Sequence, residues 1–136
     1  MPRRSIRPPQ DGAPPDIEQR IEAMLAAGET IQAVTAAEAW RAVAQRGPLA
    51  ERARAAIALA HAQTRQERFQ QAMQTADRAL ALARRSGDGR AIALALLRRA
   101  TANMSFEPEE AATDASEAAR RFETLGDVAR TGQALR

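Results

Sequence analysis

The sequence has no cysteine, no lysine and no tyrosine, and its 136 residues include one histidine, one tryptophan and three phenylalanines. The absence of cysteine excludes disulfide bonds and thiolate zinc sites. One histidine is too few for a transition-metal site unless carboxylates gather around it, and no such cluster is visible, so we expect neither a metal nor another cofactor. No nucleophile motif or phosphate-binding loop is present, which predicts a protein that is not an enzyme.

Long apolar runs are also missing. No segment approaches the roughly 18 apolar residues of a membrane-spanning helix. The N-terminal segment carries arginines but lacks the apolar core of a secretory signal. These absences predict a cytoplasmic protein with no membrane partner.

The excess of charge is small. The net charge is +3, and every basic residue is arginine. Three arginines and one aspartate before residue 16 contribute +2, which leaves +1 for residues 16–136. Proteins that read nucleic acid need a basic surface. We therefore expect no nucleic-acid partner, and an RNA-binding helical repeat is the weakest alternative.

Residues 1–15 contain five of the seven prolines and almost no apolar side chain. This composition predicts a disordered tail, either simply solvated or touching an anionic surface through its arginines. From residue 16 onward the strong helix formers alanine, leucine, arginine, glutamate and glutamine dominate, and no alternating strand pattern appears. The pattern predicts an all-α protein with helices at 16–27, 30–46, 49–65, 68–85, 89–104 and 108–124, and a seventh that begins near residue 127.

Glycine, proline and aspartate lie between the predicted helices. At three points a glycine is expected to end one helix and the following residue to start the next, at Gly47-Pro48, Gly87-Asp88 and Gly126-Asp127. Asp16 is interpreted as the start of a capping box, and Pro108 as the first residue of its helix.

These glycines recur at a nearly fixed spacing, 40 residues from Gly47 to Gly87 and 39 from Gly87 to Gly126. A period of this length built from two helices indicates an αα-solenoid, in which stacked helix pairs bury a core that no single pair could form. The predicted repeats are 16–47, 48–87 and 88–126, with the start of a fourth at 127–136. The large side chains expected to fill the core are Trp40, Ile57, Leu59, Phe69, Leu80, Leu82, Leu94, Leu96 and Phe122.

The segment AAIALAHAQTRQERFQQAMQTADRALAL (55–82) resembles a tetratricopeptide repeat, with Ala60 as the small residue inside the first helix and Phe69 opening the second. The segments ALALARRSGDGRAIALALL and AARRFETLGDVARTGQAL resemble the longer variant found in LuxR-type and other large bacterial transcription regulators, and in signalling proteins with a C-terminal GGDEF domain. The resemblance implies a right-handed αα-superhelix of three helix pairs plus a partial seventh helix. Arg98 and Arg99 depart from it, because they stand where the family commonly has apolar residues.

In tetratricopeptide-like repeats the first helix of each pair lines a concave groove, so the resemblance marks one face of these helices as a candidate binding surface. The face begins with Glu18 and Leu25, and its candidate groove residues are Glu22, Arg54, Ile57, His61, Thr64, Leu94, Leu97, Thr101 and Met104. A groove of mixed apolar and charged side chains suits an extended peptide or a partner helix. The alternative is that Ile57, Leu94 and Leu97 are ordinary core residues and the others are solvated.

Two further sets of side chains are candidate sites. His61 is a candidate pH sensor, because histidine as a residue type changes its charge near neutral pH. The simpler interpretation is a partly exposed surface histidine. Glu110, Asp114 and Glu117 share one helix face, and paired carboxylates can perform acid–base chemistry. Nothing in the sequence encloses them, and Glu117 precedes Arg121 by four residues, so we expect a solvated face with an ordinary ion pair.

These patterns together predict a non-catalytic protein–protein interaction or sensory module. Its expected partner is a protein or peptide, or a second copy that forms a homodimer through an exposed end of the solenoid. Residues 127–136 repeat the start of the first helix of a pair and then stop. This pattern predicts that the chain is the N-terminal part of a larger bacterial signalling protein, such as a diguanylate cyclase or transcription regulator. The other interpretation is that these residues form a short natural cap. The alternative function is a stand-alone adaptor or chaperone-like scaffold.

Overall fold

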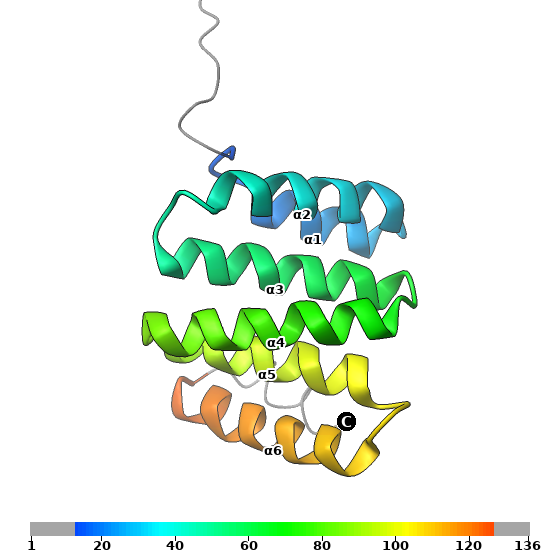
Figure 1. Cartoon of the computed structure of the whole chain (residues 1–136), viewed down its shortest axis with the longest axis vertical. Helices are drawn as coiled ribbons and strands as arrows, with labels where there is room; N and C mark the ends of the chain where they lie inside the picture. The colour runs from blue at the N-terminus through cyan, green and yellow to red at the C-terminus, as the bar shows by residue number, and fades with distance from the viewer. Residues whose placement is uncertain (1–12, 127–136) are drawn as a thin grey trace, which may run out of the picture.

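The computed structural model describes residues 13–126, which form six α-helices (Figure 1). The helices are α1 (Ile17–Ala26), α2 (Thr30–Ala44), α3 (Leu49–Arg65), α4 (Phe69–Ser86), α5 (Gly89–Asn103) and α6 (Pro108–Thr124). No strand occurs within residues 13–126, and the prediction of an all-α protein is confirmed for that range. Most of the predicted tail and the seventh helix predicted from residue 127 lie outside the described residues.

The helices form a stack in which each one contacts the next along the chain (Figure 1). Their connections are only two to four residues long, and such short connections place consecutive helices as antiparallel neighbours. The central helix α3 contacts α1 and α5 in addition to α2 and α4. In Figure 1, α1 lies behind α2 and α5 lies behind α4. The helices α1 and α5 therefore lie on one side of the stack, and α2 and α4 lie on the other.

The predicted helix boundaries agree with the structure to within two residues. Gly87 ends α4 with φ +75°, a left-handed conformation that glycine adopts without steric cost. The Asp88 side chain then accepts hydrogen bonds from the amides of Arg90 and Ala91 and caps α5, and Pro108 stands at the start of α6. These three predictions are confirmed.

Two predicted helix starts are wrong in detail. The Asp16 side chain makes no capping hydrogen bond, and its carboxylate accepts from Arg20 Nε at 3.2 Å. Gly47 does not adopt the left-handed conformation and lies two residues beyond Gln45, the C-cap of α2. Pro48 is extended, with ψ 158°, and precedes the first helical residue of α3 rather than occupying it.

The core consists of two clusters that meet on α3. The N-terminal cluster packs Ile21 and Leu25 of α1 against Trp40 of α2 and Leu59 of α3. The C-terminal cluster is built from the described parts of α3 to α6, and Phe122, with no exposed area, is its largest member. Buried alanines fill both clusters, and such small side chains let neighbouring helices approach closely.

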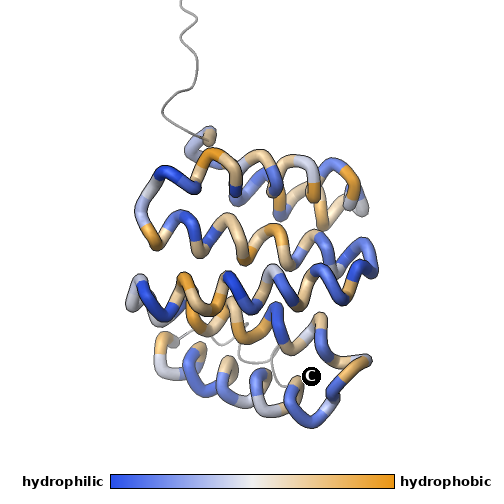
Figure 2. The backbone as a smooth tube through the Cα atoms, in the orientation of Figure 1, coloured by the Kyte–Doolittle hydropathy of each residue, from blue (hydrophilic) through white to orange (hydrophobic). Residues whose placement is uncertain are grey.

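Six of the nine large side chains expected in the core are buried, while Phe69, Leu82 and Leu94 are half-buried. The expectation omitted Ile21 and Leu25, which close the N-terminal cluster. Figure 2 shows hydrophobic and hydrophilic positions alternating along every described helix. Within residues 13–126, none of the helices combines the length and the apolar character needed to cross a bilayer.

Candidate binding surface

Side chains of α1, α3 and α5 meet around a shallow hollow, which we call the α1/α3/α5 hollow. It is lined by Glu18, Ile21, Glu22, Leu25, Ile57, Ala58, His61, Leu94 and Arg98. Four of the nine predicted groove residues are among them, namely Glu22, Ile57, His61 and Leu94. The volume of about 30 Å³ is close to that of one water molecule, so the hollow has room for a small part of one side chain.

Arg54 lies at the edge of this hollow and links three helices. Its guanidinium donates two hydrogen bonds to Glu18 Oε1, at 2.8 and 3.2 Å. The same guanidinium carbon stands 5.9 Å from the centre of the Trp40 ring, within the range of a cation–π contact. Arg54 therefore joins α3 to both α1 and α2, while its side chain stays 46% exposed.

The other predicted groove residues do not line the hollow. Leu97 is 4% exposed and belongs to the C-terminal cluster. Ile57, although it lines the hollow, is 5% exposed and belongs to the same cluster, so both residues match the core alternative. Thr64 is buried, and its hydroxyl donates to the carbonyl of Ala60 at 2.9 Å. Thr101 and Met104 are exposed further along α5 and just beyond its end.

Arg98 lines the hollow although sequence analysis did not place it there. It is 7% exposed, which is unusual for an arginine. One sequence feature could have indicated Arg98: it departs from the repeat pattern, because it stands where tetratricopeptide-like repeats commonly have apolar residues. His61 is half-buried in the same hollow, so the interpretation of a partly exposed histidine agrees with its burial.

Asp114 contradicts the expectation of a solvated acidic face. It is 8% exposed, and its two carboxylate oxygens accept from Arg99 Nε at 2.8 Å and from a second Arg99 nitrogen at 3.0 Å. Arg99 also donates to Asp77 of α4 at 3.2 Å. The hydrogen bonds with Asp114 raise the pKa of Arg99 further above its ordinary range, so this guanidinium stays charged at any accessible pH. The expectation failed because α5 covers one edge of this helix face.

The remaining acidic residues of α6 fit the ordinary expectation better. Glu117 accepts from Arg121 Nε at 3.1 Å, the ion pair that their spacing predicts. Just before the helix, a hydrogen bond with Glu110 raises the pKa of Glu107, whose carboxyl is fully exposed. Within residues 13–126, no group of three or more histidine, cysteine, aspartate or glutamate side chains is arranged to hold a metal ion.

Comparisons of the chain with protein-family models, curated proteins and solved structures find no match.

Proposed function

We propose that residues 16–126 form a tetratricopeptide-like solenoid that acts as a non-catalytic interaction or sensory module. The observation that carries the proposal is the α1/α3/α5 hollow, because it gathers side chains from the first helix of each predicted pair. The short connections and the contacts of α3 with both α1 and α5 are what a stack of helix pairs requires. The right-handed superhelical form and the partial seventh helix belong to the same proposal.

The composition of the hollow favours an extended protein segment as the partner. Half-buried Leu94 offers apolar surface, exposed Glu22 offers a negative charge, and the small volume takes up part of a side chain rather than a whole metabolite. A segment lying across α1, α3 and α5 contacts three helices at once. Such binding fixes the relative position of the helix pairs and in this way transmits a signal to neighbouring domains.

The experiment is a selection of binders from a library of extended peptides, followed by affinity measurements on variants. Glu22→Arg and His61→Ala change two residues of the hollow, and both leave the buried core side chains in place. We expect each to weaken the selected peptides about tenfold, the size of one good polar contact. Glu38→Arg is the matched control, since it reverses an exposed charge on α2 and should leave affinity unchanged. Peptides insensitive to both hollow variants would overturn the proposal.

The setting in the cell is proposed to be a longer bacterial signalling protein, with a stand-alone adaptor or scaffold as the alternative. An immunoblot of source cells separates the two, because this chain alone has a mass of 14.7 kDa. A band well above that mass supports the module in a longer protein, and a band at that mass supports the adaptor. Strong salt-dependent retention on RNA would instead favour an RNA-binding repeat.

A further inference from the structure

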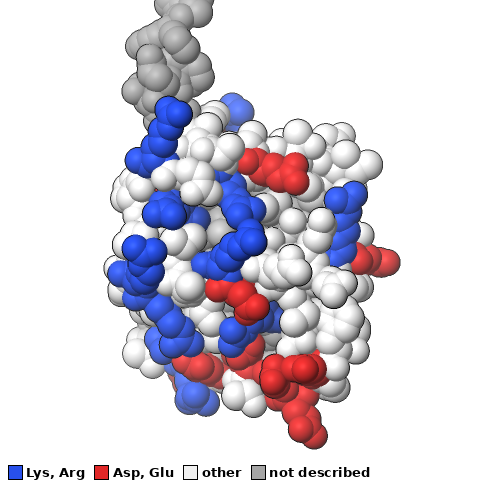
Figure 3. Space-filling view, viewed as in Figure 1, with Lys and Arg blue, Asp and Glu red and all other residues white. Residues whose placement is uncertain are grey.

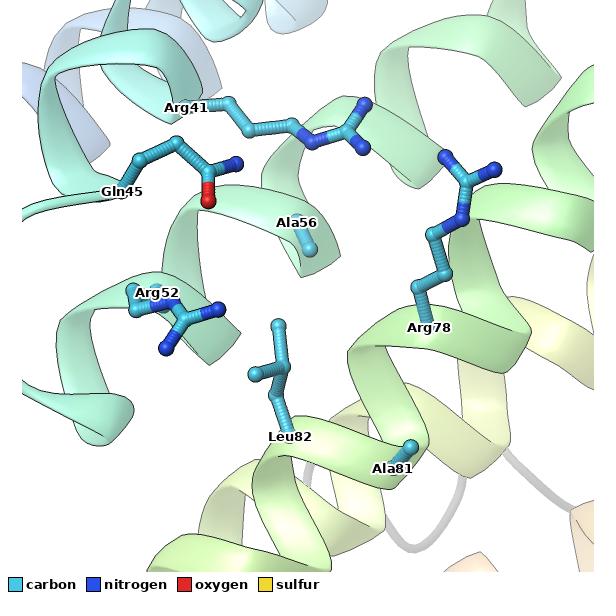
Figure 4. A pocket seen from close by; sticks show the side chains of 7 residues that line it. All are labelled: Arg41, Gln45, Arg52, Ala56, Arg78, Ala81 and Leu82. Atoms are coloured by element: carbon cyan, nitrogen blue, oxygen red, sulfur yellow. The ribbon is translucent and has the colours of Figure 1, made fainter.

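A second and larger hollow lies between α2, α3 and α4, with a volume of about 320 Å³ (Figure 4). We call it the arginine hollow, and its lining residues are Arg41, Gln45, Arg52, Ala56, Arg78, Ala81 and Leu82. Arg52 and His61 are nine residues apart on α3, and at about 100° per residue they lie on opposite sides of that helix. The arginine hollow is therefore a different surface from the α1/α3/α5 hollow.

The three arginines of this hollow lack counter-ions. Among residues 13–126, no carboxylate lies within ion-pair distance of Arg41, Arg52 or Arg78, and the three side chains make no hydrogen bond there. The Nε atom of Arg52 is buried and has no acceptor. A buried N–H group without an acceptor costs free energy that a bound anion can recover.

The acidic residues beside two of these arginines in the sequence are engaged elsewhere. Glu51, next to Arg52, accepts a hydrogen bond from the Trp40 indole at 3.1 Å. Asp77, next to Arg78, accepts from Arg99. Figure 3 shows the consequence at the surface, where arginines gather over α2, α3 and α4 and most carboxylates lie toward α6. Three positive charges thus share one hollow and repel one another until an anion enters.

The side chains of the hollow form two groups (Figure 4). The guanidiniums of Arg41 and Arg78 point toward one another from α2 and α4. Arg52 and the amide of Gln45 extend from the other side, and Ala56 and Leu82 lie between the two groups. The arrangement offers donors at two ends and apolar contact in the middle.

We propose that the arginine hollow binds a small organic molecule with two anionic groups, either carboxylates or phosphates, joined by a short carbon skeleton. One anionic group lies between Arg41 and Arg78, the other is held by Arg52 and Gln45, and the skeleton rests on Leu82. Arginine suits this task because its planar fork donates paired hydrogen bonds to carboxylate and phosphate oxygens. The volume falls at the lower end of the range for small-molecule pockets, about 300–1,000 Å³. This site goes beyond the proposed capture of a partner segment.

Calorimetric titration of the full chain at constant ionic strength tests the proposal. The probes are glutarate as a dicarboxylate and fructose 1,6-bisphosphate as a diphosphate, with acetate and inorganic phosphate as single-group references. We expect at least one of the two-group probes to bind about tenfold or more tightly than its single-group reference, since a second anionic group adds charge-assisted hydrogen bonds. Preference for glutarate identifies a carboxylate ligand, and preference for the bisphosphate identifies a phosphate ester.

Variants locate the binding. Arg41→Gln, Arg52→Gln and Arg78→Gln should each weaken binding of the preferred two-group probe about tenfold or more. The affinity of Arg52→Lys should fall between those of Arg52→Gln and the wild type, because lysine keeps the charge without the fork. Arg120→Gln is the matched control, since it removes the same charge from the exposed surface of α6. Circular dichroism of each variant verifies its fold.

Three results would overturn the proposal: no binding of either two-group probe, equal affinity for single-group anions, or equal weakening by Arg120→Gln. Peptide affinity at the α1/α3/α5 hollow should be unchanged in Arg52→Gln, so failure here and failure of the proposed function are told apart.

Discussion

Each end of the stack has an ion pair between an arginine and a carboxylate on different helices, and the two pairs differ in how far they are buried. At the N-terminal end, Arg54 binds Glu18 through side chains that are 46% and 30% exposed. At the C-terminal end, Arg99 binds Asp114 through side chains that are 30% and 11% exposed, with Asp77 as a second acceptor. Water competes with the first pair much more than with the second. We therefore expect burial, more than the identity of the residues, to determine what each ion pair contributes to stability.

The two hydrophobic clusters beside these ion pairs also differ, and the C-terminal cluster is again the more extensive one. The C-terminal cluster is centred on Phe122, which has no exposed area, and draws residues from four helices. The N-terminal cluster depends on Trp40 and Leu59, and α1, its outermost helix, has only ten residues. Because α3 supplies residues to both clusters, a change within α3 acts on both clusters at once.

The largest effect is expected for Phe122→Ala. Removal of the fully buried ring should lower the free energy of unfolding by about 3–5 kcal/mol. Urea unfolding is followed by circular dichroism, which reports all helices, and by the fluorescence of Trp40, which reports the N-terminal cluster alone. We expect part of the helical signal to be lost at a lower urea concentration than the Trp40 signal.

Leu59→Ala is the control for this prediction. Leu59 lies in the N-terminal cluster with Trp40, so its truncation should lower both transitions together. If the two signals of Phe122→Ala also coincide at every urea concentration, the two clusters unfold as one unit. Their structural difference would then not correspond to a difference in stability.

An intermediate effect is expected for Asp114→Asn. The substitution removes the charge that Arg99 binds at 2.8 Å in a mostly buried position, and should cost about 1–3 kcal/mol of unfolding free energy. Glu18→Gln is the matched change at the exposed pair and should stay within about 0.5 kcal/mol. Chemical denaturation of both variants measures the difference. Equal losses would show that burial does not separate the two ion pairs.

The order of the helices could be predicted from the sequence because the residues that end and begin each helix act locally. Gly87 and Asp88 determine their own backbone geometry and capping through atoms a few residues away. The face of α3 that contains Ile57 and His61 could also be predicted, since helical spacing places these two residues on one side of one helix. That Glu22 of α1 lies beside them was expected only from the resemblance to tetratricopeptide repeats, because local sequence does not determine how two helices meet.

The rest depends on contacts between helices. Asp114 shares a face with Glu110 and Glu117, and only the position of α5 decides that Asp114 alone meets an arginine. The arginine hollow combines Arg41, Arg52 and Arg78 from three helices, and their spacing follows neither the repeat nor the helical period. Nothing local distinguishes these three residues from the other arginines of the chain.

The smallest effect is expected for Glu67→Gly, at the turn that ends the helix shared by both clusters. Glu67 has φ +63°, and the amides of Glu67 and Arg68 donate to the carbonyls of Thr64 and Gln63, each at 2.9 Å. A residue with a Cβ atom is strained in this left-handed conformation, whereas glycine is not. After subtraction of the extra freedom of glycine in the unfolded chain, the substitution should stabilise the protein by about 0.5–1 kcal/mol.

Two controls identify the cause of that gain. Glu67→Ala removes the charge but keeps the Cβ atom, so it should leave the free energy of unfolding nearly unchanged. Gly87→Ala makes the opposite exchange at φ +75°, where no atom lies within 4 Å of an added Cβ, and should destabilise by about 1 kcal/mol through the backbone alone. Because α3 belongs to both clusters, Glu67→Gly should move the helical and Trp40 transitions together. A shift of only one of them would mean that α3 does not couple the two ends of the stack.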